Sequence, residues 1–245
     1  MRDFWATHHW PEGERRAHWH LLFDDQPAVQ GFARAHAEIL SRHPELNPVP
    51  VEWLHSTLQS VGPLTPDQAA AIAAAARSVL RAIEPFELEI GPAQAIHNGV
   101  VPAVYPEERI SALFWALRRA TESVIGAEAM PKAPQEVFWP HMSLAYSGAE
   151  WDHDELSRAL VKLRPPRALM RVTRAVLVDQ QQTWRDRYTW TVLAEAPLGG
   201  AETPAAAPER REPASGSPSR AITAETTAAV AGALAAPMAR SRRWR

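Results

Sequence analysis

The chain has 245 residues, 46% of them apolar, and a formal net charge of −2, so it can form one domain with a sizeable core and is not a strongly basic nucleic-acid scaffold. It contains no cysteine, which excludes disulfides, zinc–thiolate sites and cysteine nucleophiles. The opening MRDFWATHHW lacks the apolar run of a signal peptide, and the apolar stretch 228–239 is too short to span a bilayer. We therefore expect a cytoplasmic monomer without a membrane segment.

The first half of the chain alternates predicted strands and helices. Residues 1–17 are polar and read as irregular, and alternating apolar residues then predict a strand over 18–25. Apolar residues at helical spacing predict a helix over 26–43, and a strand over 51–62 follows a proline-rich break. A second helix is predicted over 65–83, because Thr65 can cap it and Pro66 and Asp67 suit its first turn.

The second half continues the α+β pattern. Two strands, 86–96 and 99–105, are joined by a turn at His97-Asn98-Gly99, and a helix over 106–126 ends at Gly126. The remaining predictions are a strand within 137–148, a helix over 152–163 and a two-stranded hairpin over 171–198. The pattern indicates two related α+β halves that form one domain over residues 18–198.

The composition changes at Gly199. From there to the end the chain holds seven arginines and four glutamates, a charge of +3, which leaves the preceding residues near −5. Alanine and proline dominate this part, and it ends in the basic ARSRRWR. We predict a disordered tail over 199–245.

One twelve-residue pattern occurs twice. Residues 51–62 read VEWLHSTLQSVG and residues 137–148 read VFWPHMSLAYSG, so both fit V-x-W-x-H-x-[ST]-L-x-x-x-G. In a strand, alternate residues share a face. One face of the first copy then holds Trp53, His55, Thr57 and Gln59, with Leu54 and Leu58 on the other, buried face; the second copy places Trp139, His141 and Ser143 together, with Met142 and Leu144 buried.

The paired histidines suit a particular chemistry. Splitting a phosphodiester without a metal needs a base for the attacking oxygen and an acid for the leaving oxygen, and imidazole can serve as either near neutral pH. We therefore predict that His55 and His141 are catalytic and that the hydroxyls of Thr57 and Ser143 hold the phosphate. The residues do not indicate which histidine is the base.

Two H-x-[ST] motifs in a duplicated α+β domain resemble the two-histidine (2H) phosphoesterase superfamily, in particular its LigT-like or 2'-5' RNA ligase family. The resemblance covers about residues 18–198. It implies two lobes of antiparallel sheet with helices outside and a central cleft. It also implies metal-independent, cofactor-free hydrolysis of 2',3'-cyclic phosphates or 2'-5' bonds in RNA ends or small nucleotides. Reverse, ATP-independent 2'-5' joining is seen in some members. Pro140, directly before His141, departs from a regular strand.

Four further residues are candidates for lining the substrate. Trp53 and Trp139 can stack on a nucleobase or form the floor of the cleft; His20 lies at strand spacing from His18 and can line the cleft; and Tyr146 can reach its mouth. Two alternatives stay open. One is a non-catalytic adaptor that binds RNA ends, and the other is a metallo-hydrolase that uses the histidines as ligands.

Overall fold

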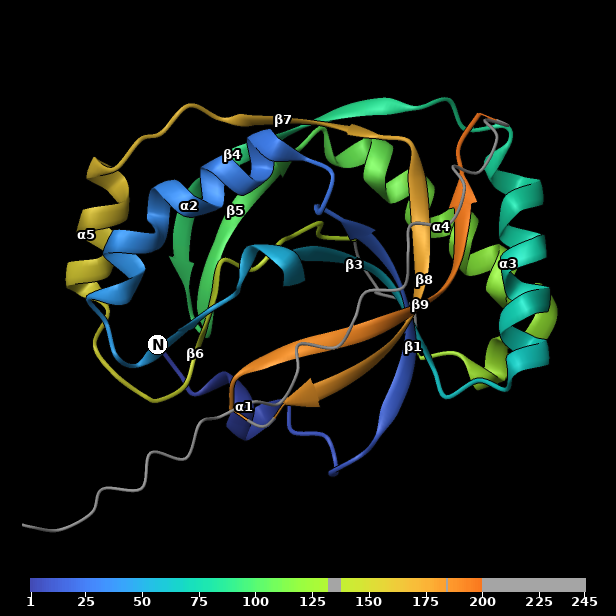
Figure 1. Cartoon of the computed structure of the whole chain (residues 1–245), viewed down its shortest axis with the longest axis horizontal. Helices are drawn as coiled ribbons and strands as arrows, with labels where there is room; N and C mark the ends of the chain where they lie inside the picture. The colour runs from blue at the N-terminus through green and yellow to red at the C-terminus, as the bar shows by residue number, and fades with distance from the viewer. Residues whose placement is uncertain (132–137, 184, 200–245) are drawn as a thin grey trace, which may run out of the picture. The chain divides into compact units, whose positions relative to one another are not determined.

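Two antiparallel sheets form the centre of the computed structural model, which describes residues 1–131, 138–183 and 185–199 (Figure 1). The first sheet has the strand order β3 (His55–Gly62), β1 (Arg15–Leu22), β8 (Arg174–Thr183) and β9 (Arg187–Pro197). The second sheet has the order β2 (Leu46–Pro48), β6 (Ala145–Ser147), β5 (Gly99–Tyr105), β4 (Phe86–Ile96) and β7 (Ala168–Val172). The predicted tail lies outside the described residues, apart from Gly199.

Five α-helices and two short 3-10 helices complete the described part. The α-helices are α1 (Phe4–Thr7), α2 (Pro27–Ser41), α3 (Pro66–Leu80), α4 (Glu107–Ile125) and α5 (Asp154–Lys162), and the 3-10 turns are η1 (Val51–Trp53) and η2 (Ala127–Ala129). The helix predictions for α2 to α5 are confirmed within a few residues. Their local signals also act as expected: Thr65 forms a capping box with Gln68 at the start of α3, and Gly126, with φ of 84°, ends α4.

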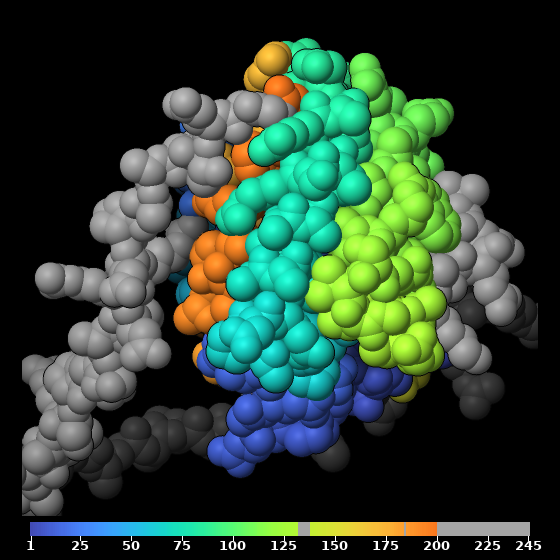
Figure 2. Space-filling view, turned by 90° about the vertical axis from the view of Figure 1, so that its right-hand side faces the viewer, coloured from blue at the N-terminus to red at the C-terminus, as the bar shows by residue number. Residues whose placement is uncertain are grey.

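The helices cover the outer face of each sheet. Helices α3 and α4 pack together and against strands β9 and β3 of the first sheet, while α2 and α5 pack against β7 and β4 of the second. Figure 2 shows α3 and α4 side by side, with the orange edge of β9 next to α3. Because the apolar side of each sheet faces its helices, the opposite sides remain available for a cavity (Figure 1).

The two sheets are not two contiguous halves of the chain. The C-terminal hairpin β8–β9 joins β1 and β3, and the short strand β2, which precedes β3 in sequence, pairs with β6 in the second sheet. Helix α2 likewise follows a strand of the first sheet and covers the second. The predicted two-sheet α+β fold is correct, but each sheet takes strands from both ends of the chain.

Three predicted elements differ in detail. The first strand begins at Arg15, three residues earlier than predicted, and residues 4–7 of the segment expected to be irregular form α1, which Asp3 caps through its side chain. The residues before His55 form the turn η1 rather than a strand. The segment around His141 is not in a strand either: pairing begins only at β6, with the Leu144 amide donating to the Val100 carbonyl. Pro140 explains part of this, since it has no N–H to donate to a ladder.

Candidate active site

A cavity of about 590 Å³ lies where the two sheets face each other. Both predicted pairs line it: His55 and Thr57 from β3 of the first sheet, and His141 and Ser143 from the segment that leads into β6 of the second. The two copies of the motif, separated in sequence by 86 residues (141 − 55), therefore meet at one cavity. The volume is in the range that small-molecule sites occupy.

The two imidazoles are held in the same way. In each, Nδ1 is hydrogen-bonded to the backbone carbonyl oxygen of the tryptophan two residues earlier. The distance from Nδ1 to that oxygen is 2.9 Å for His55 and Trp53 and 3.1 Å for His141 and Trp139. A carbonyl oxygen can only accept, so each Nδ1 carries the proton and each neutral ring keeps its Nε2 lone pair free. His18 makes the same bond to the Arg16 carbonyl, so this bond alone does not mark a catalytic histidine.

Burial keeps these histidines neutral. Desolvation lowers the pKa of His55 to about 4, although the bond to the Trp53 carbonyl opposes it, and the nearby His18 and His141 lower it further. Desolvation also lowers the pKa of His141, and the bond to the Trp139 carbonyl opposes it. His55 is buried whereas His141 is partly exposed. Both rings are thus poised as neutral imidazoles, with His55 in the drier position.

Beneath Thr57 lies a fully buried third histidine, His20. Its Nε2 is 3.3 Å from the Thr57 hydroxyl, its ring stacks on His55 at 4.5 Å and 24°, and its Nδ1 has no hydrogen-bond partner among the described residues. Burial, followed by the charges of His55 and His18, holds the pKa of His20 well below its usual value. A neutral ring has one proton, and only at Nε2 does that proton find an acceptor. The ring therefore donates to Thr57 Oγ1 and leaves the hydroxyl proton free to point into the cavity.

His20 thus does not line the cavity, contrary to the sequence prediction, and His18 does. Both residues face the same side of β1, but His20 is directly paired with Thr57, which covers it. Tyr146, by contrast, does line the cavity. It is buried and in hydrogen-bond contact with the Ser143 side chain, and burial raises the pKa of its hydroxyl. Each of the two candidate phosphate-binding hydroxyls is therefore next to a polar aromatic side chain, His20 for Thr57 and Tyr146 for Ser143.

The two tryptophans of the repeat have different surroundings. Trp53 packs edge-on against Trp190 at 4.9 Å, together with Leu22, Val176 and Val178, and does not line the cavity. Trp139 lines the cavity, is 50% exposed and stacks on the His141 ring at 4.8 Å and 20°. The sequence left the choice between a floor and a stacking surface open. Trp53 packs in an apolar cluster outside the cavity lining, and of the two tryptophans only Trp139 offers an exposed ring to the cavity.

A β-bulge changes which residues of β3 face the cavity. Thr57 pairs with His20 and Gln59 with the adjacent Trp19, so Leu58 is the extra residue and the alternation shifts after it. Consequently Ser60 lines the cavity and Gln59 does not, contrary to the face predicted from strict alternation. A bulge has no clear sequence signal here, because no glycine or proline lies at that point.

Several cavity residues were not predicted. Arg16 and His18 come from β1, Gln180 and Tyr188 from the C-terminal hairpin, and Phe4, His8 and Trp10 from the N-terminal segment. The N-terminal residues are anchored there: the Trp5 indole is fully buried and donates to the Asn47 side chain, and Phe4 packs on Tyr146 at 4.5 Å. Seven of the residues within 1–19 are phenylalanine, tryptophan or histidine. This aromatic content could have indicated that the segment packs on the domain, because a solvent-exposed segment rarely contains so many aromatic rings.

Strand pairing next to the second motif depends on one glycine. A Cβ on Gly99 would lie 2.5 Å from the Ala145 carbonyl oxygen. Gly99 pairs with Tyr146 at the start of β5, so the close approach of β5 and β6 sets the position of the segment that carries His141. Among the described residues, no group of three or more histidine, aspartate or glutamate side chains is arranged to hold a metal ion.

Comparisons with known proteins address the fold and the family. Solved structures with the same fold include a Thermus thermophilus protein, which is 20% identical with a TM-score of 0.60 and matches 76% of this chain and 100% of its own. Escherichia coli LigT complexed with 3'-AMP is 20% identical with a TM-score of 0.54, over 76% of this chain and 98% of its own. LigT complexed with phosphate is 19% identical with a TM-score of 0.51 over the same shares.

The search of curated proteins finds no match. In the part of the chain that the structure describes, none of the helices has the length and apolar character needed to cross a membrane. The family comparison is positive: the model of the 2'-5' RNA ligase superfamily matches residues 23–184, well over half of the chain and both histidine motifs. This chain therefore belongs to the 2'-5' RNA ligase superfamily, the two-histidine phosphoesterases with a LigT-like fold.

Proposed function

We propose that the protein is a metal-independent phosphodiesterase that opens 2',3'-cyclic phosphates on RNA ends or small nucleotides, using His55 and His141 as general base and general acid. One observation carries the proposal: two H-x-[ST] motifs, one on β3 of the first sheet and one on the segment that leads into β6 of the second, line the same cavity, and each imidazole is oriented by a hydrogen bond from Nδ1 to a backbone carbonyl. Family membership supports a phosphoesterase activity. The 2'-5' phosphodiester bond is a second substrate for the same groups.

The difference in burial between the two rings supports an assignment of their roles in hydrolysis. His55 is the drier and stays neutral, so its Nε2 takes a proton from water as the water oxygen attacks phosphorus. The bond from phosphorus to one ribose oxygen breaks, and His141, the more accessible ring, gives that oxygen a proton from Nε2. An anionic phosphate next to His141 favours its protonated form, which overcomes part of the lowering of its pKa by burial.

The hydroxyls stabilise the phosphate between the rings. Because His20 donates to Thr57 Oγ1, the Thr57 proton is available for a non-bridging phosphate oxygen, and Ser143, on the segment that leads into β6, donates from the second motif. With a ribose 5' hydroxyl as the nucleophile in place of water, the same base and acid can join that hydroxyl to a cyclic phosphate, and the displaced ribose oxygen again receives its proton from the acid. Ligation then needs no ATP, because the energy of the cyclic ester drives the new bond.

The proposal is tested with adenosine 2',3'-cyclic phosphate and a 2'-5' linked dinucleotide, each with and without EDTA. We expect turnover that EDTA leaves unchanged and that His55→Ala and His141→Ala each reduce by about 10²–10⁴-fold, the usual contribution of one proton transfer. His43→Ala is the matched control, because His43 packs on Trp151 and does not line the cavity.

Three other results would contradict the proposal. Turnover that EDTA abolishes would favour a metallo-hydrolase, and turnover that survives both histidine substitutions would exclude the two-histidine mechanism. Binding of a 3'-phosphorylated or cyclic RNA end without any turnover would favour an adaptor.

A further inference from the structure

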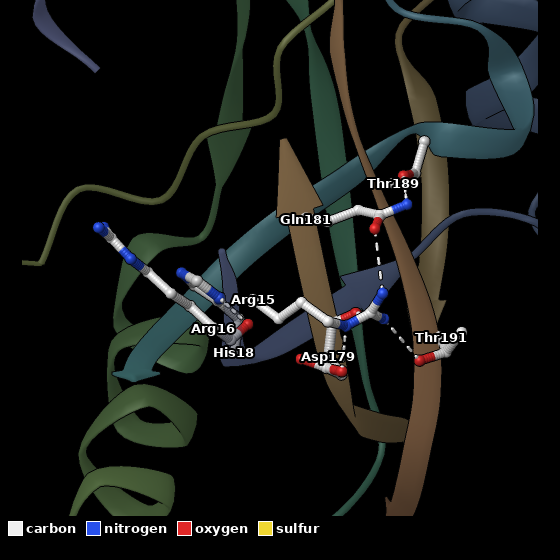
Figure 3. A network of polar contacts seen from close by, with 7 residues as sticks. All are labelled: Arg15, Arg16, His18, Asp179, Gln181, Thr189 and Thr191. Carbon is white, nitrogen blue, oxygen red and sulfur yellow. Dashed lines mark hydrogen bonds and ion pairs between the residues drawn. The ribbon is translucent and has the colours of Figure 1, made fainter. Parts of the chain in front are cut away.

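Two successive arginines of β1 point in opposite directions. Arg15 lies on the side of the strand away from the cavity and donates to Asp179, to Gln181 at 3.0 Å and to Thr191 at 3.1 Å (Figure 3). Arg16 extends to the other side in the same view, next to His18 (Figure 3), and both line the cavity. Because side chains alternate between the two faces of a strand, Arg15 contacts neighbouring strands of the sheet and Arg16 lines the cavity.

Arg16 has hydrogen-bonding capacity that the described residues do not use. Its Nε donates to Glu14 at 2.6 Å and its guanidinium lies over the Trp10 ring at 4.4 Å. These contacts hold the group in place, and its side chain is 37% exposed. Both terminal nitrogens remain able to donate to a ligand. Among the described residues that line the cavity, Arg16 is the only lysine or arginine. A guanidinium that lines a cavity and has terminal nitrogens available to donate is suited to a phosphate.

A second unused polar group lies beside Arg16. Gln180 is its Cα partner on β8, lines the cavity and is 3% exposed, and its side-chain oxygen has no hydrogen-bond partner within the part of the chain that the structure describes. By turning about its last side-chain bond, the amide can present either its oxygen or its NH2 group to a ligand. The Arg16 end of the cavity is therefore polar and incompletely satisfied by the protein alone.

The spacing relates this end of the cavity to the catalytic pair. Arg16 and His20 are four residues apart on one strand, which separates their Cα atoms by roughly 13 Å, and His20 is paired with Thr57. His18 and Ser60, which are paired with each other, line the cavity between these two points. The Arg16 side chain can span part of this interval, and the remainder is comparable to the length of a nucleoside.

We propose that Arg16 binds a second phosphate of the substrate, attached to the 5' oxygen of the nucleotide whose cyclic phosphate lies between His55 and His141. This inference rests on the proposed function and narrows its substrate class. The preferred substrate carries phosphate on both sides of the reacting ribose, as the 3' end of an RNA strand does, rather than being a cyclic mononucleotide without a 5' phosphate.

The experiment compares adenosine 2',3'-cyclic phosphate with and without a 5' phosphate on the wild type, Arg16→Gln and Arg15→Gln. Because hydrogen bonds between charged groups are stronger than neutral ones, we expect the wild type to prefer the 5'-phosphorylated substrate by about 10- to 100-fold in kcat/KM. Arg16→Gln brings this ratio close to one. Arg15→Gln removes the same charge from the same strand and keeps the ratio, which separates a local contact from a general effect of charge.

Each alternative result decides the inference. Equal kcat/KM for the two substrates in the wild type, or an unchanged ratio in Arg16→Gln, would overturn it. Absence of turnover with both substrates would instead defeat the proposed function. The subsite would then be decided by calorimetry: adenosine 3',5'-bisphosphate binding at least about tenfold tighter than adenosine 3'-phosphate, with the difference lost in Arg16→Gln, supports it, and equal affinities refute it.

Discussion

The two copies of the histidine motif place the same side chains at one cavity with different backbones. The first copy enters a regular strand at His55, pairs with β1 and contains a bulge. The second copy runs through Pro140 and His141 without strand pairing and joins a sheet only at Leu144 and β6. Both nevertheless orient their imidazole by a bond to the carbonyl two residues before. The local bond, rather than the strand, is what the repeat preserves.

The surroundings of the two copies differ more than their backbones. His55 and the His20 beneath it are buried with Trp190 against the first sheet, whereas His141 is partly exposed under the half-exposed Trp139. A repeated motif therefore need not give two equivalent sites. Burial sets the pKa of each histidine, and the hydrogen-bond partner of each hydroxyl determines whether that hydroxyl can donate to a ligand. Three experiments test this asymmetry.

The largest expected effect concerns the two hydroxyls. Thr57→Val removes a donor that the buried His20 orients, and we expect kcat/KM to fall about 10²-fold, as for a preorganised oxyanion donor. Ser143→Ala should cost less, because Ser143 is partly exposed and water can replace it. His20→Phe keeps an aromatic ring but not the donor, so it should cost nearly as much as Thr57→Val.

A double-mutant cycle isolates the role of His20. If His20 acts through Thr57, adding His20→Phe to Thr57→Val has little further effect on kcat/KM, and His20→Gln, which retains an N–H, recovers part of the activity of His20→Phe. Additive losses, with no recovery in His20→Gln, would show that His20 only fills space. Circular dichroism of each variant confirms that the fold is retained.

The next effect is the dependence of rate on pH. The base must be neutral, so activity falls as pH drops through the pKa of His55, about 4. The acid must be protonated, so kcat/KM falls as pH rises above the pKa of His141, which lies below its usual 6.5. We expect a bell-shaped profile with its maximum below pH 6.5 and an alkaline decline of about tenfold per pH unit.

The pH dependence of kcat sharpens this test. The bound phosphate favours the protonated imidazole, so the alkaline limb of kcat should lie at higher pH than that of kcat/KM. Initial rates between about pH 5 and 8, in buffers of constant ionic strength, give the alkaline limbs of both parameters. A flat kcat/KM over this range would mean that His141 does not titrate as the acid in the catalytic step.

The smallest effect on activity separates the two tryptophans. Trp139→Ala should raise KM several-fold and leave stability nearly unchanged, because the exposed ring offers a stacking surface for a base. Trp53→Ala should instead lower the free energy of unfolding by about 2 kcal/mol, because the Trp53 ring packs on Trp190 in an apolar cluster of the first sheet. Urea unfolding and KM for the cyclic nucleotide measure the two effects. The reverse assignment would follow if Trp53→Ala changed KM and Trp139→Ala changed stability.

The sequence alone determined the kind of fold and the pairs of residues that carry the proposed chemistry. Hydrophobic periodicity, the Thr65 cap and Gly126 located the helices, because these signals depend on neighbouring residues only. The repeated motif identified His55, Thr57, His141 and Ser143, because side-chain chemistry and spacing survive a change of backbone. Leu54, Leu58, Met142 and Leu144 are buried as alternation predicted.

Only the tertiary structure decided which residues share the cavity and in what state. Ser60 and Gln59 exchange faces through a bulge, His20 is hidden while His18 lines the cavity, and Arg16 arrives with an N-terminal segment anchored by Trp5. The C-terminal hairpin adds Gln180 and Tyr188, which are far from β1 in the sequence. These outcomes depend on contacts between distant segments and on the burial they create, which no local pattern in the chain encodes.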